Sequence, residues 1–217
     1  VGGGGARGHR GVRAARLRAG EAGSDRPVNS PVDRDIPVAG GMAGGSADAE
    51  GALVACDALW GVGSSKAALE ALGAELGSDV PFALNGGTAI GSGRGDQLVP
   101  VLGRGRYHWV FALSDVGLST AKVYAECDRL RAGRRVPEPV PTASMMTALR
   151  AGDSASLGRA LSNDLQPAAL ALQPRLAEVL ETGMEFGALG GIVSGSGPTV
   201  AFLVADTERG LDLAVAL

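Results

Sequence analysis

The chain has 217 residues, of which 45% are hydrophobic and 4% aromatic, and its formal net charge is −3 at pH 7. A chain of this length forms one large domain or two small ones, and its core must consist mainly of Ala, Val and Leu. The small negative charge and the lack of a long apolar run argue against a nucleic-acid-binding protein and against a membrane span.

The two cysteines, Cys56 and Cys127, provide neither a disulfide framework nor the spacing of a metal site. The first residues also lack the apolar central region of a secretory signal peptide. We therefore expect a cytoplasmic protein without a metal site built from cysteine or histidine.

Residues 1–30 differ in composition from the rest of the chain. A run of glycines is followed by scattered arginines, namely Arg7, Arg10, Arg13, Arg16, Arg18 and Arg26. The apolar residues between them follow neither a helical nor a strand period, so the segment buries too little surface to offset its chain entropy. We expect it to be disordered, or to be translated from a wrong start or frame. A nucleic-acid-binding arm is the alternative, although no aromatic residue is present to stack on bases.

Two glycine pairs, Gly40-Gly41 and Gly44-Gly45, follow an extended, proline-containing approach over residues 31–38. Apolar residues at steps of three and four then predict a helix from about Ser46 to Trp60. A glycine-rich loop that enters a helix N-terminus binds anions, because the first N–H groups are unpaired and the helix dipole is positive there. Neither common phosphate-binding fingerprint is present. A glycine-rich turn before a buried helix therefore remains the alternative.

A second helix, predicted over residues 65–76 with Ser65 as its N-cap, leads to Asp79. Asp79 is either a turn residue beside Pro81 or a carboxylate that accepts a proton from a substrate hydroxyl. Glycine turns and a short strand over residues 86–95 follow, and residues 98–102 are extended.

The second half of the chain begins with a strong strand signal over residues 107–113. A helix then begins at Ser119-Thr120, with Thr120 as a candidate N-cap, and runs to about Arg131. Further helices are expected over residues 143–150, 154–161 and 176–183, with the polar pair Asn163-Asp164 in a break between two of them. Residues 192–204 predict a tight glycine turn between two strands, and the last residues begin another helix.

Three separate segments resemble sequence motifs of one protein family and follow one another in the order found in that family. They are Pro37–Ala47, Leu76–Phe82 and Ser194–Thr199. The first and third resemble two motifs of the superfamily of galactokinase, homoserine kinase, mevalonate kinase and phosphomevalonate kinase. Together with Gly86–Ala89 and Asn163–Leu165, the pattern is similar to the 4-diphosphocytidyl-2-C-methyl-D-erythritol kinase family.

This resemblance implies an α+β fold with two domains and an active site in the cleft between them. Residues 31–104 would be the remainder of an N-terminal ATP-binding domain, and residues 105–217 an incomplete C-terminal α+β domain. The resemblance implies a monomer or a homodimer that binds a small-molecule substrate, with no nucleic acid and no membrane partner.

The resemblance also implies a reaction. With ATP and Mg²⁺ bound, the 2-hydroxyl of 4-diphosphocytidyl-2-C-methyl-D-erythritol would attack the γ-phosphoryl group of ATP. Asp79 would orient or deprotonate that hydroxyl. Thr120 and Tyr124 would bind the substrate, with Tyr124 against the cytosine ring. Ser46 and Asp48 are both candidates for a Mg²⁺ ligand, and neither is assigned. The implied ATP-binding residues are Pro37, Val38, Ala39, Gly40, Gly41, Met42, Ala43, Gly44, Gly45, Ser46, Ala47, Ser194, Gly195, Ser196 and Gly197.

The chain departs from the family's pattern at its first motif, a strand with Ala-Lys and a later Gly-Tyr-His segment. No lysine precedes Lys66, and no tyrosine precedes Tyr107. We therefore expect a truncated or frame-shifted product with weak or no activity. A non-catalytic nucleotide-binding fragment and another small-molecule kinase of the superfamily are the alternatives.

Overall fold

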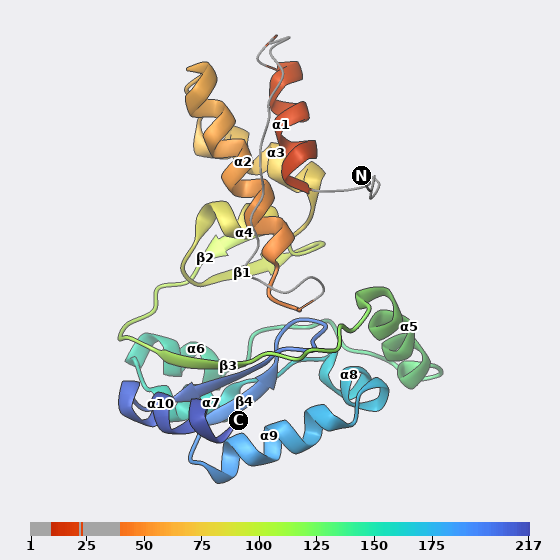
Figure 1. The fold of residues 1–217 in the computed structure, drawn as a ribbon, viewed down its shortest axis with the longest axis vertical. Helices are drawn as coiled ribbons and strands as arrows, with labels where there is room; N and C mark the ends of the chain where they lie inside the picture. Colours follow the sequence, from red (N-terminus) through yellow and green to blue (C-terminus); the bar gives the residue numbers. More distant parts are fainter. Residues whose placement is uncertain (1–9, 22, 24–39) are drawn as a thin grey trace, which may run out of the picture. The chain divides into compact units, whose positions relative to one another are not determined.

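The computed structural model describes residues 10–21, 23 and 40–217, which belong to two compact units (Figure 1). Of these residues, unit 1 contains 10–21, 23 and Ala43–Val101, and unit 2 contains 40–42 and Leu102–Leu217. The chain passes from one unit to the other after Met42 and again after Val101. The second passage lies close to the domain boundary predicted after residue 104.

The described part of unit 1 consists of four helices and one antiparallel β-hairpin. Leu72, Leu76 and Val80 pack with Ala49 and Leu53 in one buried cluster. The predicted apolar face of the long helix is thereby confirmed. In chain order the elements are α1 (Arg10–Glu21), α2 (Gly44–Trp60), α3 (Lys66–Leu76), α4 (Val80–Asn85), β1 (Ala89–Ser92) and β2 (Gln97–Pro100).

Helix α1 corrects the expectation for residues 1–30. It packs against α2, with Ala14 fully buried and Arg18 only 2% exposed. The Arg18 guanidinium donates hydrogen bonds to Asp57 and Ser64 near the end of α2. The expected disorder is therefore wrong for residues 10–21. The sequence hides this helix because its buried positions hold small alanines and a paired arginine instead of large apolar residues.

Helix α2 begins at Gly44, two residues before the predicted start, and ends at Trp60. Its C-cap, Gly61, adopts the left-handed conformation with φ 61°. Near this end, hydrogen bonds from Ser64 and then from Arg18 hold the pKa of Asp57 below its ordinary value, against the effect of burial. Burial raises the pKa of the Cys56 thiol, which is consistent with a small core residue. The C-terminal end of α2 is therefore fixed by protein contacts.

Unit 2 contains an antiparallel sheet in the order β3-β5-β4, formed by β3 (His108–Ala112), β4 (Gly190–Val193) and β5 (Val200–Val204). His108 pairs with Val204, so it is a strand residue as predicted. The helices of this unit are α5 (Thr120–Arg131), α6 (Ala143–Ala151), α7 (Ser154–Ala160), α8 (Gln166–Leu172), α9 (Arg175–Glu185) and α10 (Thr207–Ala216).

The core of unit 2 centres on Phe202 of β5, which is fully buried. A Cβ atom on Gly183 of α9 would lie 2.1 Å from the Phe202 ring, so only glycine lets α9 approach the sheet this closely. Val123 and Cys127 of α5 join the same cluster. The core therefore holds both the sheet and α5 in place.

Two short helices, α4 and α8, were not expected from the sequence. Each has a proline in its first turn, Pro81 in α4 and Pro167 in α8. Proline is compatible with this position because the first N–H groups of a helix need no partner within it. A third difference is that Ser119 occupies the N-cap of α5, while Thr120 is the first helical residue.

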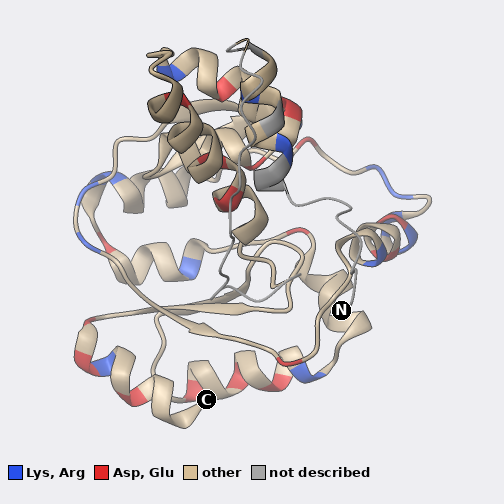
Figure 2. Ribbon diagram, turned by 45° about the horizontal axis from the view of Figure 1, so that its top comes forward, with Lys and Arg blue, Asp and Glu red and all other residues tan. Residues whose placement is uncertain are grey.

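Charged residues occur on helices of both units (Figure 2). On α9 and α10 acidic residues outnumber basic ones, with Glu178, Glu181, Glu185, Glu208 and Asp212 against Arg175 and Arg209. In the described part of the chain, every helix is too short or too polar to cross a membrane.

Candidate active site

The predicted glycine turn between two strands is present and joins β4 to β5. The Ser194 N–H donates to the Thr199 carbonyl at 2.8 Å, and the Gly197 N–H donates to the Ser194 carbonyl at 2.8 Å. Gly195 and Gly197 have φ angles of +55° and +75°, which glycine adopts at little cost. The turn formed by residues 194–199 is therefore narrow and internally hydrogen-bonded.

Gly40 and Gly41 contact this turn within unit 2. The Ser194 hydroxyl donates to the Gly41 carbonyl at 2.9 Å, and the Thr199 N–H donates to the Gly40 carbonyl at 3.3 Å. A Cβ atom on Gly41 would lie 2.3 Å from the Ser194 carbonyl oxygen and 2.8 Å from that of Gly197. The two glycine segments therefore lie in direct contact.

The N-terminus of α2 follows directly. Ala43 is its N-cap, with φ 51° and no hydrogen bond from its side chain, so no side chain of the cap covers the first turn. Among the described residues outside its chain neighbours and the nearby backbone of α2, a Cβ atom on Gly45 would meet no atom within 4 Å. Open space therefore lies beside the first N–H groups of α2, which form the positive end of the helix dipole. This combination suits an anionic group such as a phosphate.

Asp79 occupies the N-cap position of α4 in unit 1 and is exposed. Its carboxylate does not cap that helix and accepts a hydrogen bond from the Ser78 hydroxyl at 3.3 Å. Val80, the next residue, packs in the same buried cluster as Ala49 of α2. Asp79 is thereby carried on a rigid part of the same unit as the N-terminal half of α2, with its carboxylate accessible to a substrate.

The two predicted substrate-binding residues lie on α5 in unit 2. The hydroxyl groups of Thr120 and Ser196 are 2.9 Å apart and form a hydrogen bond, so α5 is joined directly to the glycine turn. Tyr124 is 55% exposed, whereas its neighbour Val123 is fully buried. Core packing therefore does not explain Tyr124, and its ring is available to a ligand.

The remaining predicted site residues are placed as follows. Met42 ends the unit 2 part of the loop, and Ser46 and Ala47 lie in the first helical turns of α2 in unit 1. Pro37, Val38 and Ala39 fall outside the described residues. Sequence reasoning gave no role to Asn163 and Gln166, whose side chains contact the backbone of β4 and its turn. Asn163 lies between two helices and Gln166 begins α8, and a polar residue at such a position does not indicate which backbone atoms it contacts.

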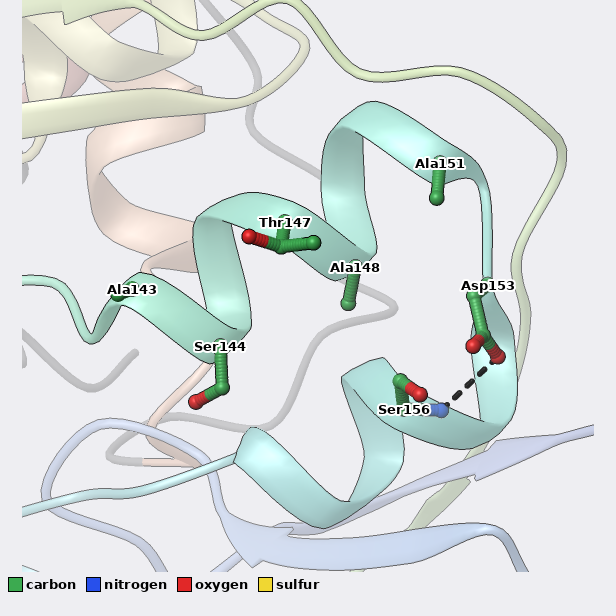
Figure 3. Close-up of a pocket in the computed structure, with 7 residues that line it drawn as sticks. All are labelled: Ala143, Ser144, Thr147, Ala148, Ala151, Asp153 and Ser156. Atoms are coloured by element: carbon green, nitrogen blue, oxygen red, sulfur yellow. Dashed lines mark hydrogen bonds between the residues drawn. The ribbon is translucent and has the colours of Figure 1, made fainter.

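A separate hollow of about 370 Å³ lies between α6 and α7 in unit 2 (Figure 3). Small side chains line it, and its one carboxylate, Asp153, accepts a hydrogen bond from the Ser156 N–H at 3.0 Å. That carboxylate already caps α7, and it would repel an anionic ligand. This hollow therefore lacks the chemistry of a phosphate site.

Family comparisons cover both halves of the chain. Residues 10–87 match the family profile described as "GHMP kinases N terminal domain", and residues 145–217 match "GHMP kinases C terminal". The first match includes all of α1, so that helix is part of the family's sequence. The expectation that this stretch results from mistranslation is therefore wrong.

Individual relatives with high sequence identity show to which family of this superfamily the chain belongs. The 4-diphosphocytidyl-2-C-methyl-D-erythritol kinase of Streptomyces avermitilis is 54% identical over 206 residues, which are 95% of this chain and 69% of that protein. The chain belongs to the 4-diphosphocytidyl-2-C-methyl-D-erythritol kinase family. The enzyme of the same name from Thermobifida fusca is 57% identical over 206 residues, or 95% of this chain and 66% of that protein. The chain thus spans about two thirds of the length of these kinases.

A solved structure agrees with this assignment. The crystal structure of a 4-(cytidine 5'-diphospho)-2C-methyl-D-erythritol kinase is 29% identical and superposes with a TM-score of 0.81. The match covers 99% of this chain and 76% of that one. The α+β kinase fold predicted from the sequence is therefore confirmed.

Proposed function

We propose that this kinase binds ATP on the loop that contains Gly40–Ser46 and transfers the γ-phosphoryl group to the 2-hydroxyl of 4-diphosphocytidyl-2-C-methyl-D-erythritol. The observation that carries the proposal is the open backbone at Gly45, where α2 begins. Alanine would be more stable than glycine at a helical position with free space around it. The space at Gly45 lies at a helix N-terminus, where a phosphate of ATP can be bound.

Several backbone groups would hold the triphosphate. The N–H groups at the start of α2 bind phosphate oxygens through hydrogen bonds and the helix dipole. The turn at residues 194–199 contacts Gly40 and Gly41, which precede α2. The loop therefore needs little rearrangement when ATP binds. Mg²⁺ binds mainly through phosphates and water with one or two protein oxygens, and it neutralises charge on the transferred group. No cluster of three metal-binding side chains is required for this role, and the described residues contain none.

Asp79 would act on the attacking hydroxyl. A carboxylate can accept the proton of an alcohol as the oxygen attacks phosphorus, and can orient that alcohol for in-line transfer. Asp79 suits this role because it is exposed and does not cap α4.

Thr120 and Tyr124 would select the substrate. The exposed Tyr124 ring offers a stacking surface for cytosine, and stacking of an aromatic side chain on a base contributes about 1–3 kcal/mol. The Thr120 hydroxyl adjoins the glycine turn through Ser196. Residues of α5 would thereby recognise the cytidine end of the substrate.

The test compares the unmodified chain with Asp79→Asn, using radiolabelled ATP, Mg²⁺ and the diphosphocytidyl substrate. We expect slow label transfer by the unmodified chain, because no lysine precedes Lys66, and a further loss of about 10²–10⁴-fold in kcat for the variant. ATP affinity, measured by calorimetry, should stay nearly unchanged in Asp79→Asn. Asp115→Asn, at another exposed aspartate, serves as the control and should retain both transfer and binding.

Two outcomes would favour the rival functions. ATP binding without any phosphoryl transfer by the unmodified chain would indicate a nucleotide-binding protein that does not catalyse. Transfer that cytidine diphosphate fails to inhibit would indicate a kinase for a different small alcohol.

A further inference from the structure

Asn163, in the connection between α7 and α8, uses its whole amide group. Its Nδ2 atom donates to the carbonyl oxygen of Val193 at 2.8 Å and to that of Gly195 at 2.7 Å. Its Oδ1 atom accepts from the Leu165 N–H at 2.9 Å. The opposite amide orientation would place Oδ1 against two carbonyl oxygens, so the network allows only this one.

The two carbonyl oxygens belong to the end of β4 and to the glycine turn that receives Gly41. Gln166 adds a third contact from the same segment, because its Oε1 atom accepts from the Val193 N–H at 2.9 Å. The connection between α7 and α8, together with the first residue of α8, therefore holds one side of the turn. Gly40 and Gly41 contact the turn through Ser194 and Thr199.

A purely local role accounts for only part of this arrangement. An asparagine that shapes its own loop needs the bond from its Oδ1 to the N–H two residues later, which Leu165 supplies. The two Nδ2 bonds reach residues 30 and 32 positions away in the sequence. They fix the position of the turn relative to the helices, which local loop formation does not require.

We propose that Asn163 is a positioning residue for nucleotide binding, which acts by holding the glycine turn that supports the phosphate loop. This inference rests on the proposed function, since it assigns the ATP phosphates to the loop at Gly40–Ser46. Asn163 itself contacts the turn and not the ligand. Loss of its two donors leaves the turn able to move away from Gly41.

The decisive variant is Asn163→Asp, which keeps an oxygen for the Leu165 N–H and replaces the NH₂ donor by a second acceptor. Repulsion between this acceptor and the two carbonyl oxygens should displace the turn. Asp164→Asn is the adjacent control, because the exposed Arg131–Asp164 pair contributes little. Leu213→Ala, in the core of unit 2 on α10, is the control for lost stability without contact to the turn.

Three quantities are measured for each variant: ATP affinity by calorimetry, KM for both substrates, and amide hydrogen exchange at Gly197 and Thr199. For Asn163→Asp we expect ATP affinity to fall at least about tenfold, equal to about 1.4 kcal/mol. KM for ATP should rise with it, while KM for the cytidine substrate should change little. The two amides should exchange faster than in either control.

Equal ATP affinity and equal exchange in Asn163→Asp and Leu213→Ala would overturn the proposal, because Asn163 would then contribute stability alone. Failure of the unmodified chain to transfer phosphate would contradict the proposed function. In that case ATP affinity and exchange still decide the role of Asn163, because neither measurement requires turnover.

Discussion

Gly41 and Gly45 lie four residues apart in one loop, yet they are glycines for opposite reasons. At Gly41 protein fills the place of a side chain, since a Cβ atom would lie 2.3 Å from the Ser194 carbonyl oxygen. At Gly45 nothing fills that place within 4 Å. The first glycine is explained by the fold, and the space beside the second, at a helix N-terminus, is open to a ligand.

The two ends of α2 differ in the same way. At its C-terminal end, Gly61 caps the helix, and Asp57 is paired with Arg18 and Ser64. Its N-terminal end begins without a capping side chain, beside open space at Gly45. A helix that is fixed at one end and open at the other can present its first N–H groups to a phosphate without losing stability elsewhere.

Gly41→Ala should have the largest effect. Its φ of +73° strains any other residue by about 1–2 kcal/mol, and the backbone contact with the turn cannot relax without moving the loop. We expect ATP affinity to fall about a hundredfold or more, near 2.7 kcal/mol. Gly133→Ala is the matched control, because Gly133 has the same φ and no atom within 4 Å. Equal ATP affinity in both variants would show that the contact with the turn is unimportant.

Gly45→Ala should separate binding from stability. An added Cβ meets no protein atom, and alanine favours the helix by up to about 1 kcal/mol, so the melting temperature should rise. The same Cβ occupies the space assigned to the phosphates, so ATP affinity should fall about tenfold. Gly51→Ala, at a position of the same helix that is also open, should stabilise to a similar degree and leave ATP affinity unchanged. Unaltered ATP binding in Gly45→Ala would remove the main argument for a phosphate site.

Tyr124, like Gly45, is a residue that contacts within the protein do not explain. We expect Tyr124→Leu to raise KM for the cytidine substrate about fivefold, at the low end of base-stacking energies, with little change in KM for ATP. Tyr124→Phe keeps the ring and should behave like the unmodified chain. Since the side chain is 55% exposed, the melting temperature should stay constant. A drop in melting temperature with unchanged KM would instead assign Tyr124 to the fold.

The smallest expected effect concerns the C-terminal end of α2, where Asp57 is paired with Arg18 and Ser64. It should appear in the pH dependence of the free energy of unfolding. Because the pKa of Asp57 is lowered in the folded chain, its contribution is present above the pKa of unfolded Asp, about 3.9, and is lost as pH falls through the lower folded value. Asp57→Asn should therefore be less stable near neutral pH and lose less stability on acidification. Thermal melts from pH 7 to 3 measure this, and identical pH profiles would contradict it.

Sequence reasoning identified the elements that carry large apolar residues or turn-forming glycines. The long helix, the short strand before residue 95, the three strands of unit 2 and the glycine turn all follow from such signals, whereas the pairing of that short strand with the next segment in a hairpin was not predicted. It missed α1 because the buried positions of that helix include Ala14 and Arg18, which give no hydrophobic period. It missed α4 because Asp79 and Pro81 were interpreted as a turn, and it made no prediction for the residues of α8.

The part of the candidate site that consists of residues in the family's motifs could be predicted from the sequence. The contact between Gly41 and the distant turn agrees with the family pattern and is present. The support from Asn163 could not be predicted, because a single polar residue does not reveal which backbone atoms it reaches across 30 positions. The assignment of individual residues to ATP and to the cytidine substrate stays a prediction.

The most direct test of the central claim is an NMR titration of the ¹⁵N-labelled chain with Mg·ATP. Amide resonances at the start of α2, those of Gly44, Gly45 and Ser46, should shift most, followed by those of the turn at residues 194–199. Shifts confined to other regions, such as the hollow between α6 and α7, or no shifts at saturating ATP would contradict the assignment of the phosphates to this loop.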